Sequence, residues 1–136
     1  MIDLSAAAQT TAGIAVLAAI TVTTGGYLLL RIGTGRVAAT DFQRTFFRAG
    51  HAHAGVFITL GLVALLLAEA TSLAGLWGWL ARTGVLVAAI LMPAGFFLSA
   101  IGPDRRSPSR WIVLLYLGAA FLIAGLAALG VGLLIG

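Results

Sequence analysis

The sequence predicts an all-α integral membrane protein, a four-helix bundle with short loops, and three observations lead to this fold class. The chain is 61% hydrophobic and only 9% charged, whereas soluble domains are about 45–50% apolar and about 25% charged. A membrane-spanning helix needs about 20 apolar residues, and four such runs are separated by short polar segments. The length of 136 residues leaves no room for another domain. We therefore expect residues 1–136 to form one transmembrane domain.

The four spans are expected at residues 11–30, 49–68, 76–101 and 111–134. The first span carries threonines and the pair Gly25-Gly26; small and hydroxylated residues allow helices to approach closely in lipid, so this face is predicted to look toward the bundle. Thr40 is typical of a helix N-cap, which predicts a short interfacial helix leading into the second span.

Proline and glycine mark the last two spans. Pro93 lies inside the third span, where a proline usually kinks the helix; the kink either opens a pocket or is tolerated in packing. The fourth span carries glycines that give it one smooth flank: Gly118, Gly125, Gly130 and Gly132.

The basic residues are arginines and number eight. A pI near 11.2 would suggest nucleic acid in a soluble protein, but these arginines lie between apolar runs, where the positive-inside rule accounts for them. Membrane lipids, and not nucleic acid, are therefore the expected partners. All arginines except Arg82 fall in the connections between spans one and two and between spans three and four. This distribution predicts a multi-pass protein of the cell membrane, with both basic loops cytoplasmic and both termini outside.

The two histidines of the chain, His51 and His53, lie at the start of the second span. An ionisable side chain at membrane depth indicates function by default, although a histidine near the interface can also be purely structural. Two residues apart on a helix, the two side chains point about 200° away from each other. They therefore cannot hold one metal ion together, and the chain has no cysteine to supply a thiolate ligand.

A single histidine ligand suits a haem. Small residues beside the histidines leave room for the porphyrin: Ala49, Ala52 and Gly55. Arginines at the same end can pair with the propionates: Arg48, Arg105 and Arg106. Aromatic and apolar residues can line the cavity: Phe57, Met92, Phe96 and Phe97. One histidine leaves the iron five-coordinate, which suits Lewis-acid or ligand-binding chemistry.

The segment from Arg48 to Gly55, with Ala52-His53-Ala54-Gly55 at its centre, resembles styrene oxide isomerase. That family consists of small four-span membrane proteins, assembled as trimers, that bind haem b through a histidine on the second span. Gly95-Phe96-Phe97 and the glycine-rich last span are also similar. The resemblance implies a homotrimer in which His53 is the axial iron ligand, and ferric haem acts as a Lewis acid that turns an aryl epoxide into an aldehyde.

The sequence departs from the family at the residues that orient the substrate. Nearly two turns after the ligand, this chain has Thr59 where the family has an amide side chain. It also has Phe97 in place of the family's tyrosine and Pro93 in place of a second amide. The resemblance thus implies a haem site beside an altered pocket for a small apolar ligand. Thr59 and Phe97 occupy the catalytic positions of that pocket.

Two other interpretations stay open. The chain is then either a haem-binding module without catalysis, for sensing, storage or transfer, or a cofactor-free accessory membrane subunit. A transporter is disfavoured because no span carries a mid-membrane charge. Periodicity does not choose between the histidines. His53 is preferred because it lies deeper and has Ala49 one turn earlier, and His51 is the alternative.

Overall fold

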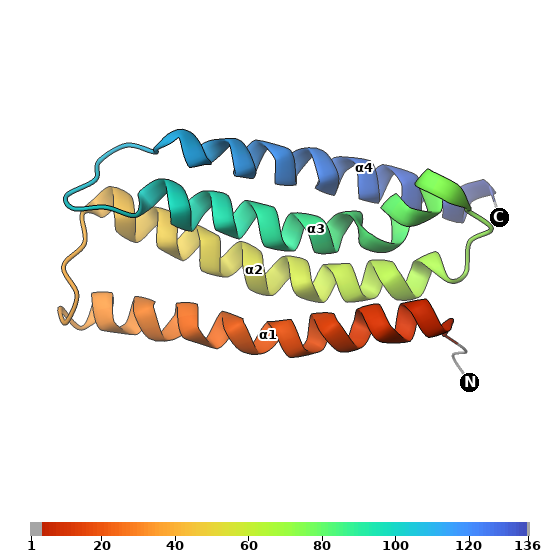
Figure 1. The fold of residues 1–136 in the computed structure, drawn as a ribbon, viewed down its shortest axis with the longest axis horizontal. Helices are drawn as coiled ribbons and strands as arrows, with labels where there is room; N and C mark the ends of the chain where they lie inside the picture. Colours follow the sequence, from red (N-terminus) through yellow and green to blue (C-terminus); the bar gives the residue numbers. More distant parts are fainter. Residues whose placement is uncertain (1–3, 136) are drawn as a thin grey trace.

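Four α-helices form a bundle in the computed structural model, which describes residues 4–135 (Figure 1). They are α1 (Ala6–Gly33), α2 (Asp41–Ala68), α3 (Gly75–Ala100) and α4 (Val113–Ile135), and a 3₁₀ turn, η1 (Arg110–Ile112), leads into α4. Each of α1, α2, α3 and the η1–α4 segment is long and apolar enough to cross a membrane. The predicted all-α class and its four candidate spans are confirmed. The helix α1 extends past both of its predicted ends, and α2 begins at Asp41 and not at residue 49, whereas the other helix ends lie close to the predicted bounds.

The start of α2 confirms the predicted N-cap at Thr40. The Thr40 hydroxyl accepts a hydrogen bond from the Gln43 backbone N–H, and the Gln43 side chain accepts one from the Thr40 N–H, which completes a capping box. The expected interfacial helix is not a separate element, because α2 continues unbroken from Asp41 to Ala68. No glycine or proline interrupts residues 41–49, so nothing ends the helix before the span begins.

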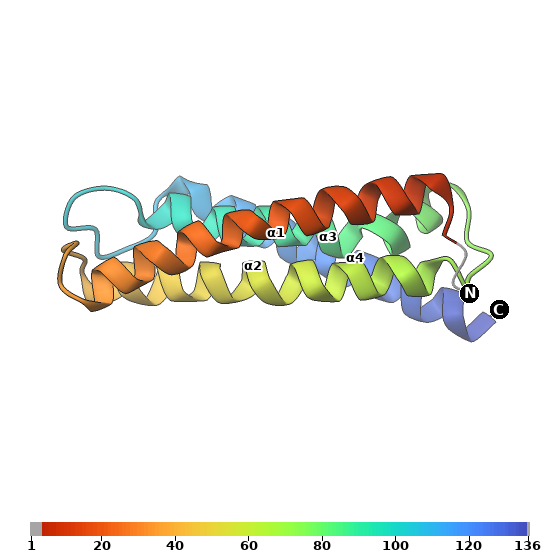
Figure 2. The same cartoon turned by 90° about the horizontal axis from the view of Figure 1, so that it is seen from below.

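The order of packing places α3 between α2 and α4, with α1 against α2 at the edge of the bundle (Figure 1). Seen from below, α1 runs obliquely across α2 (Figure 2). At the α3–α4 contact the backbones nearly touch, since a Cβ added at Gly84 would lie 2.8 Å from the Gly125 Cα. Gly118 and Gly132 also lie against neighbouring residues, whereas Gly130 has open space around it. Gly118, Gly125 and Gly132 of the predicted smooth flank thus lie on the face that contacts α3 and the loop before it, whereas Gly130 does not.

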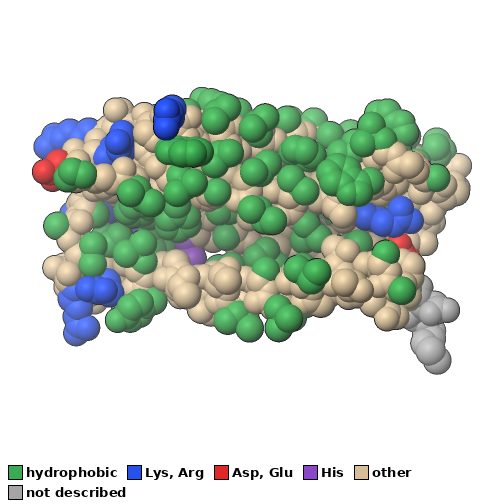
Figure 3. Space-filling model, viewed as in Figure 1, with side chains coloured by type: hydrophobic (Ala, Val, Ile, Leu, Met, Phe, Trp, Pro, Cys, Tyr) green, Lys and Arg blue, Asp and Glu red, His purple; other side chains and the backbone are tan. Residues whose placement is uncertain are grey.

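The basic loops lie together at one end of the bundle. Segments 34–40 and 101–109 occupy the end opposite to the start of α1 and the end of α4 (Figure 1). The space-filling view shows arginines gathered at that end, and a basic and an acidic side chain together at the other (Figure 3). At this second end the Arg82 Nε lies 2.9 Å from the Glu69 Oε1. The Ser5 N–H also donates to the Glu69 carboxylate, at 3.0 Å.

Candidate functional site

The two histidines lie on different flanks of α2, as their spacing predicted. The His51 ring faces α1, where it contacts Gly25 and Gly26. The His53 ring instead contacts Phe57 on its own helix and Phe96 on α3. Both side chains are half-buried, but their surroundings differ in ways that decide what each can bind.

The ring of His53 is held in one tautomer. Its Nδ1 lies 2.7 Å from the Ala49 carbonyl oxygen, one turn earlier in α2. Because a carbonyl only accepts hydrogen bonds, Nδ1 carries the proton and the lone pair is on Nε2. Histidines that bind metals almost always donate their other ring N–H to such an acceptor. Nε2 itself has no hydrogen-bond partner among the described residues.

Two aromatic rings contact the ring of His53. The Phe57 ring meets it edge-on, with centroids 5.3 Å apart, and the Phe96 ring lies tilted at 4.9 Å. Phe46 packs edge-on against Phe96, with centroids 5.5 Å apart. His53 therefore combines an Nε2 lone pair, held in a fixed orientation, with apolar and aromatic neighbours.

The ring of His51 is enclosed by α1. A Cβ added at Gly25 would lie 3.2 Å from its Nδ1, and one added at Gly26 would lie 3.3 Å from its Cε1 and 3.5 Å from its Nε2. Its Nδ1 is buried without a hydrogen-bond partner. A porphyrin centred on His51 would collide with α1, and the ring lacks the orienting acceptor that His53 has. Of the two, His53 is the histidine with the geometry of a metal ligand.

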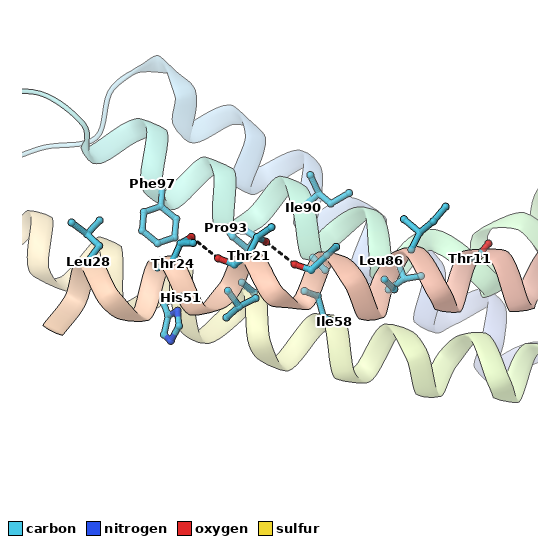
Figure 4. Close-up of a pocket in the computed structure, with 17 residues that line it drawn as sticks. Thr11, Thr21, Thr24, Leu28, His51, Ile58, Leu86, Ile90, Pro93 and Phe97 are labelled. Carbon is cyan, nitrogen blue, oxygen red and sulfur yellow. Dashed lines mark hydrogen bonds between the residues drawn. The ribbon is translucent and has the colours of Figure 1, made fainter. Parts of the chain in front are cut away.

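An apolar cavity of about 630 Å³ opens beside His51 (Figure 4). It lies in the groove that α1 and α3 form over α2. Phe97 and Pro93 from α3 and Thr21 and Thr24 from α1 are among its lining residues. Histidine surface is visible in a hollow between α1 and the helices above it in Figure 3. The cavity is therefore accessible from the side of the bundle.

The small residues predicted to accompany His53 are spread around α2. Ala49 supplies the carbonyl that holds the ring. Ala52 is exposed, and the Gly55 carbonyl accepts the Thr59 hydroxyl at 3.0 Å. Gly55 lies two residues after His53 and so points about 200° away from it. Within one chain, the structure brings together Ala49 and His53 but not Gly55.

The three arginines predicted near the propionates lie at the basic end. Arg48 is exposed and, five residues before His53, is displaced from it by about 140° around α2. Arg105 and Arg106 are in the loop after α3, where the Arg105 Nε donates to the Ile101 carbonyl at 2.9 Å and Arg106 is exposed. These arginines share a membrane depth with the start of α2, yet they do not form one cluster around His53.

The two predicted catalytic positions also lie apart from His53. Thr59 is exposed on α2. Phe97 points to the other flank, where it lines the cavity, stacks on Phe47 with ring centroids 5.5 Å apart, and lies so close to Gly50 that an added Cβ would be 2.9 Å from its ring. A single chain therefore does not assemble Thr59, Phe97 and His53 into one pocket.

Two features that position the site were not predicted from the sequence. The pair Gly25-Gly26 was predicted to face the bundle, but its contact with the ring of His51 was not. A glycine inside a helix costs about 1 kcal/mol relative to alanine, so two in succession indicated a close contact without naming its partner. The second is Gln43, whose side chain donates to the Ala100 carbonyl at the end of α3.

Comparisons of this chain with protein-family models, with curated proteins and with solved structures gave no match. Within residues 4–135, no group of three or more His, Cys, Asp or Glu side chains is placed to hold a metal ion. A site in this part of the chain would therefore rest on a single histidine and on what the bound group itself brings.

Proposed function

We propose that this chain is a haem b-binding integral membrane protein of the type that styrene oxide isomerase represents, in which His53 would hold the iron. The observation that supports it best is the 2.7 Å contact between the His53 Nδ1 and the Ala49 carbonyl. This contact leaves the Nε2 lone pair free, so that this nitrogen could bind a haem iron.

The residues around His53 suit a porphyrin. Phe57 and Phe96 pack against the imidazole and add apolar surface beside it. The arginines at the basic end of the bundle supply cations for the propionates, although within one chain they do not surround His53. A second copy of the chain would complete the site from its own basic end. We therefore propose a homo-oligomer, a trimer by the resemblance.

When bound, ferric haem supplies a Lewis acid for isomerising an epoxide to an aldehyde without net redox change. Orienting an epoxide also needs a hydroxyl or amide donor near the open face. Phe97 has no such donor, and the Thr59 hydroxyl bonds its own helix at Gly55. The positions of these two residues favour a second candidate, a haem-binding module without isomerase activity. On either account, turnover of styrene oxide is expected to be weak or absent.

Absorption spectroscopy tests this proposal. The protein is produced with a haem supply, purified in mild detergent, and compared with the variants His53→Ala and His51→Ala. The unmodified protein is expected to show a Soret band, which His53→Ala abolishes and His51→Ala mostly retains. The reverse pattern would move the ligand to His51. A folded protein that shows no haem absorption would leave the cofactor-free accessory subunit as the better account.

Turnover of styrene oxide by the haem-loaded protein then separates the two candidates. Product at rates similar to those of a styrene oxide isomerase would show that Thr59, or a tyrosine from a neighbouring copy, orients the epoxide. Haem absorption without product would favour the non-catalytic module.

A further inference from the structure

We propose that the cavity between α1, α2 and α3 binds an elongated, neutral, lipophilic molecule that carries one hydroxyl or carbonyl group, and that His51 forms the hydrogen bond to that group. This site lies on the other flank of α2 from His53. It therefore goes beyond the proposed haem function and does not depend on it.

The shape of the cavity determines the shape of the ligand. Along α1 its lining residues extend from Thr11 to Leu28, which at about 1.5 Å rise per residue is a length of about 25 Å. On the opposite side, α3 contributes residues from Leu86 to Phe97. A volume of about 630 Å³ spread over that length describes a narrow channel parallel to the helices, and not a round pocket. It suits a single extended chain that lies across much of the membrane.

The lining determines the polarity of the ligand. Among residues 4–135, no Asp, Glu, Lys or Arg lines the cavity, so a charged group would find no partner among these lining residues. The hydroxyls of the lining threonines already donate to carbonyls of their own helix, Thr21 to Ala18 at 2.6 Å and Thr24 to Thr21 at 2.6 Å. The ligand must therefore be almost wholly apolar.

Unlike these threonines, the His51 side chain in the cavity lining makes no hydrogen bond to another described residue. Neither of its ring nitrogens has a partner among the described residues, and Nδ1 is buried. Nδ1 is closed in against Gly25 of α1, so Nε2 is the ring nitrogen that a ligand can reach. A neutral imidazole has one donor and one acceptor nitrogen. According to the tautomer, Nε2 therefore either donates to a carbonyl or hydroxyl oxygen of the ligand or accepts from its hydroxyl.

The position of His51 orients the ligand. The ring lies against Gly25 and Gly26, close to the end of the cavity marked by Leu28 and nearest the basic loops. The polar group of the ligand is therefore placed near that end, and its tail runs along α1 toward Thr11. Because α1 packs mainly on α2, the side between α1 and α3 offers a route of entry from the lipid.

Photolabelling in lipid nanodiscs tests this inference. The probe is a long-chain primary alcohol with a diazirine along its chain, and the control probe is the matching hydrocarbon without the hydroxyl. The alcohol is expected to label residues of α1 and α3 that line the cavity. His51→Phe keeps a ring against Gly25 but removes the hydrogen bond, and should lower labelling by the alcohol about threefold to tenfold without changing labelling by the hydrocarbon.

A second pair of variants keeps the test independent of any effect of His51 on folding. Ala18 is exposed and lines the cavity, so Ala18→Trp should fill the channel and suppress labelling by the alcohol. Val16 is exposed and does not line the cavity, so Val16→Trp should leave labelling unchanged. Equal labelling by both probes, unaffected by His51→Phe, would identify the channel as a space for lipid tails only and overturn the proposal, as would label confined to residues outside the cavity. If the unmodified protein showed no Soret band, this would contradict the haem proposal but would leave the proposal for the cavity unaffected.

Discussion

Gln43 joins the start of α2 to the end of α3. Its Nε2 donates to the Ala100 carbonyl at 3.0 Å and to the Gly102 carbonyl at 2.8 Å, and its Oε1 accepts from the Thr40 N–H at 3.0 Å. The side chain is buried. One residue thereby satisfies backbone groups at the ends of two helices, which would otherwise lack partners within their own helices.

Replacing Gln43 should destabilise the fold. Gln43→Leu has a similar size but leaves the buried carbonyls unpaired, which is expected to lower the free energy of unfolding by about 1–3 kcal/mol. Thermal unfolding in mild detergent measures this effect. Gln9→Leu is the matched control, because the Gln9 side chain is exposed and bonds only the nearby Leu4 carbonyl. Equal shifts in the two variants would contradict the role assigned to Gln43.

Glu69 makes the stability of the fold depend on pH. Hydrogen bonds from Arg82 and from Ser5 lower the pKa of this carboxyl from 4.5 to about 2. Since the pKa is lower in the folded state, this contribution to stability is fully present above pH 4.5 and is lost as the pH falls toward 2. The midpoint of thermal unfolding should therefore fall with acidification in the unmodified protein and fall less in Glu69→Gln. An unchanged pH profile in Glu69→Gln, matching that of the loop variant Asp104→Asn, would contradict this account.

The two histidines show what a sequence can predict about a residue. Their opposite directions follow from helix geometry alone, and so does the acceptor for His53, because the Ala49 carbonyl is one turn earlier in the same helix. The residues against which the His51 ring packs, Gly25 and Gly26, belong to a different helix, α1. Nothing in the spacing of α2 indicates which flank α1 will cover, so the enclosure of His51 could not be predicted.

At the scale of the elements, glycines set the closest helix contact. Gly125 on α4 meets Gly84 on α3, and a Cβ added at Gly125 would lie 3.0 Å from the Gly84 Cα. Close backbone approach through small residues is a principal means by which helices associate in lipid. The α3–α4 contact therefore depends on the absence of side chains at these positions. A cluster of buried residues from α2, α3 and α4 also contributes to the core: Ala64, Ala68, Ala81, Val85, Ala128 and Leu129.

Filling this contact should separate the two helices. Gly125→Leu is expected to destabilise the fold by about 1–3 kcal/mol or more through overpacking, seen as a lower midpoint of thermal unfolding in detergent. Gly130→Leu makes the same chemical change on the same helix, where the added Cβ meets nothing within 4 Å. It should shift the midpoint much less. Comparable losses would show that helix propensity and not packing governs both variants.

Helix existence was predictable, whereas helix packing was not. Long apolar runs bounded by polar segments define the four helices in the sequence. However, spans that are apolar on nearly every side carry little periodicity to indicate which face is buried. The central position of α3 and the peripheral position of α1 therefore emerge only in three dimensions. The separation of Thr59 and Phe97 from His53 has the same origin, since it depends on which flanks of α2 its neighbours occupy.

At the scale of the whole molecule, the bundle has one strongly basic end. The arginine-bearing loops lie together there, and the start of α1 and the end of α4 lie at the opposite end (Figure 1). The positive-inside rule concerns arginines in short loops close to the spans, and both basic loops are short. The proposed orientation therefore places the His51 and His53 end of α2 toward the cytoplasm.

A reporter fused after α4 tests this orientation. A periplasmic or extracellular reporter enzyme at the C-terminus should be active, and a cytoplasmic reporter at the same position should be inactive. Moving the fusion point into the loop at 34–40 should reverse both readings. Cytoplasmic activity of the C-terminal fusion would contradict the orientation.

The central claim is that the Nε2 of His53 binds haem iron, and rescue by imidazole measures this most directly. His53→Gly leaves a space the size of the lost side chain. The purified variant is expected to lack the Soret band and to regain it when haem is supplied together with free imidazole, which takes the place of the missing ligand. His51→Gly, with the same cost of a glycine inside α2, should keep the band without imidazole. A His53→Gly variant that retains the full Soret band in the absence of imidazole would contradict the claim.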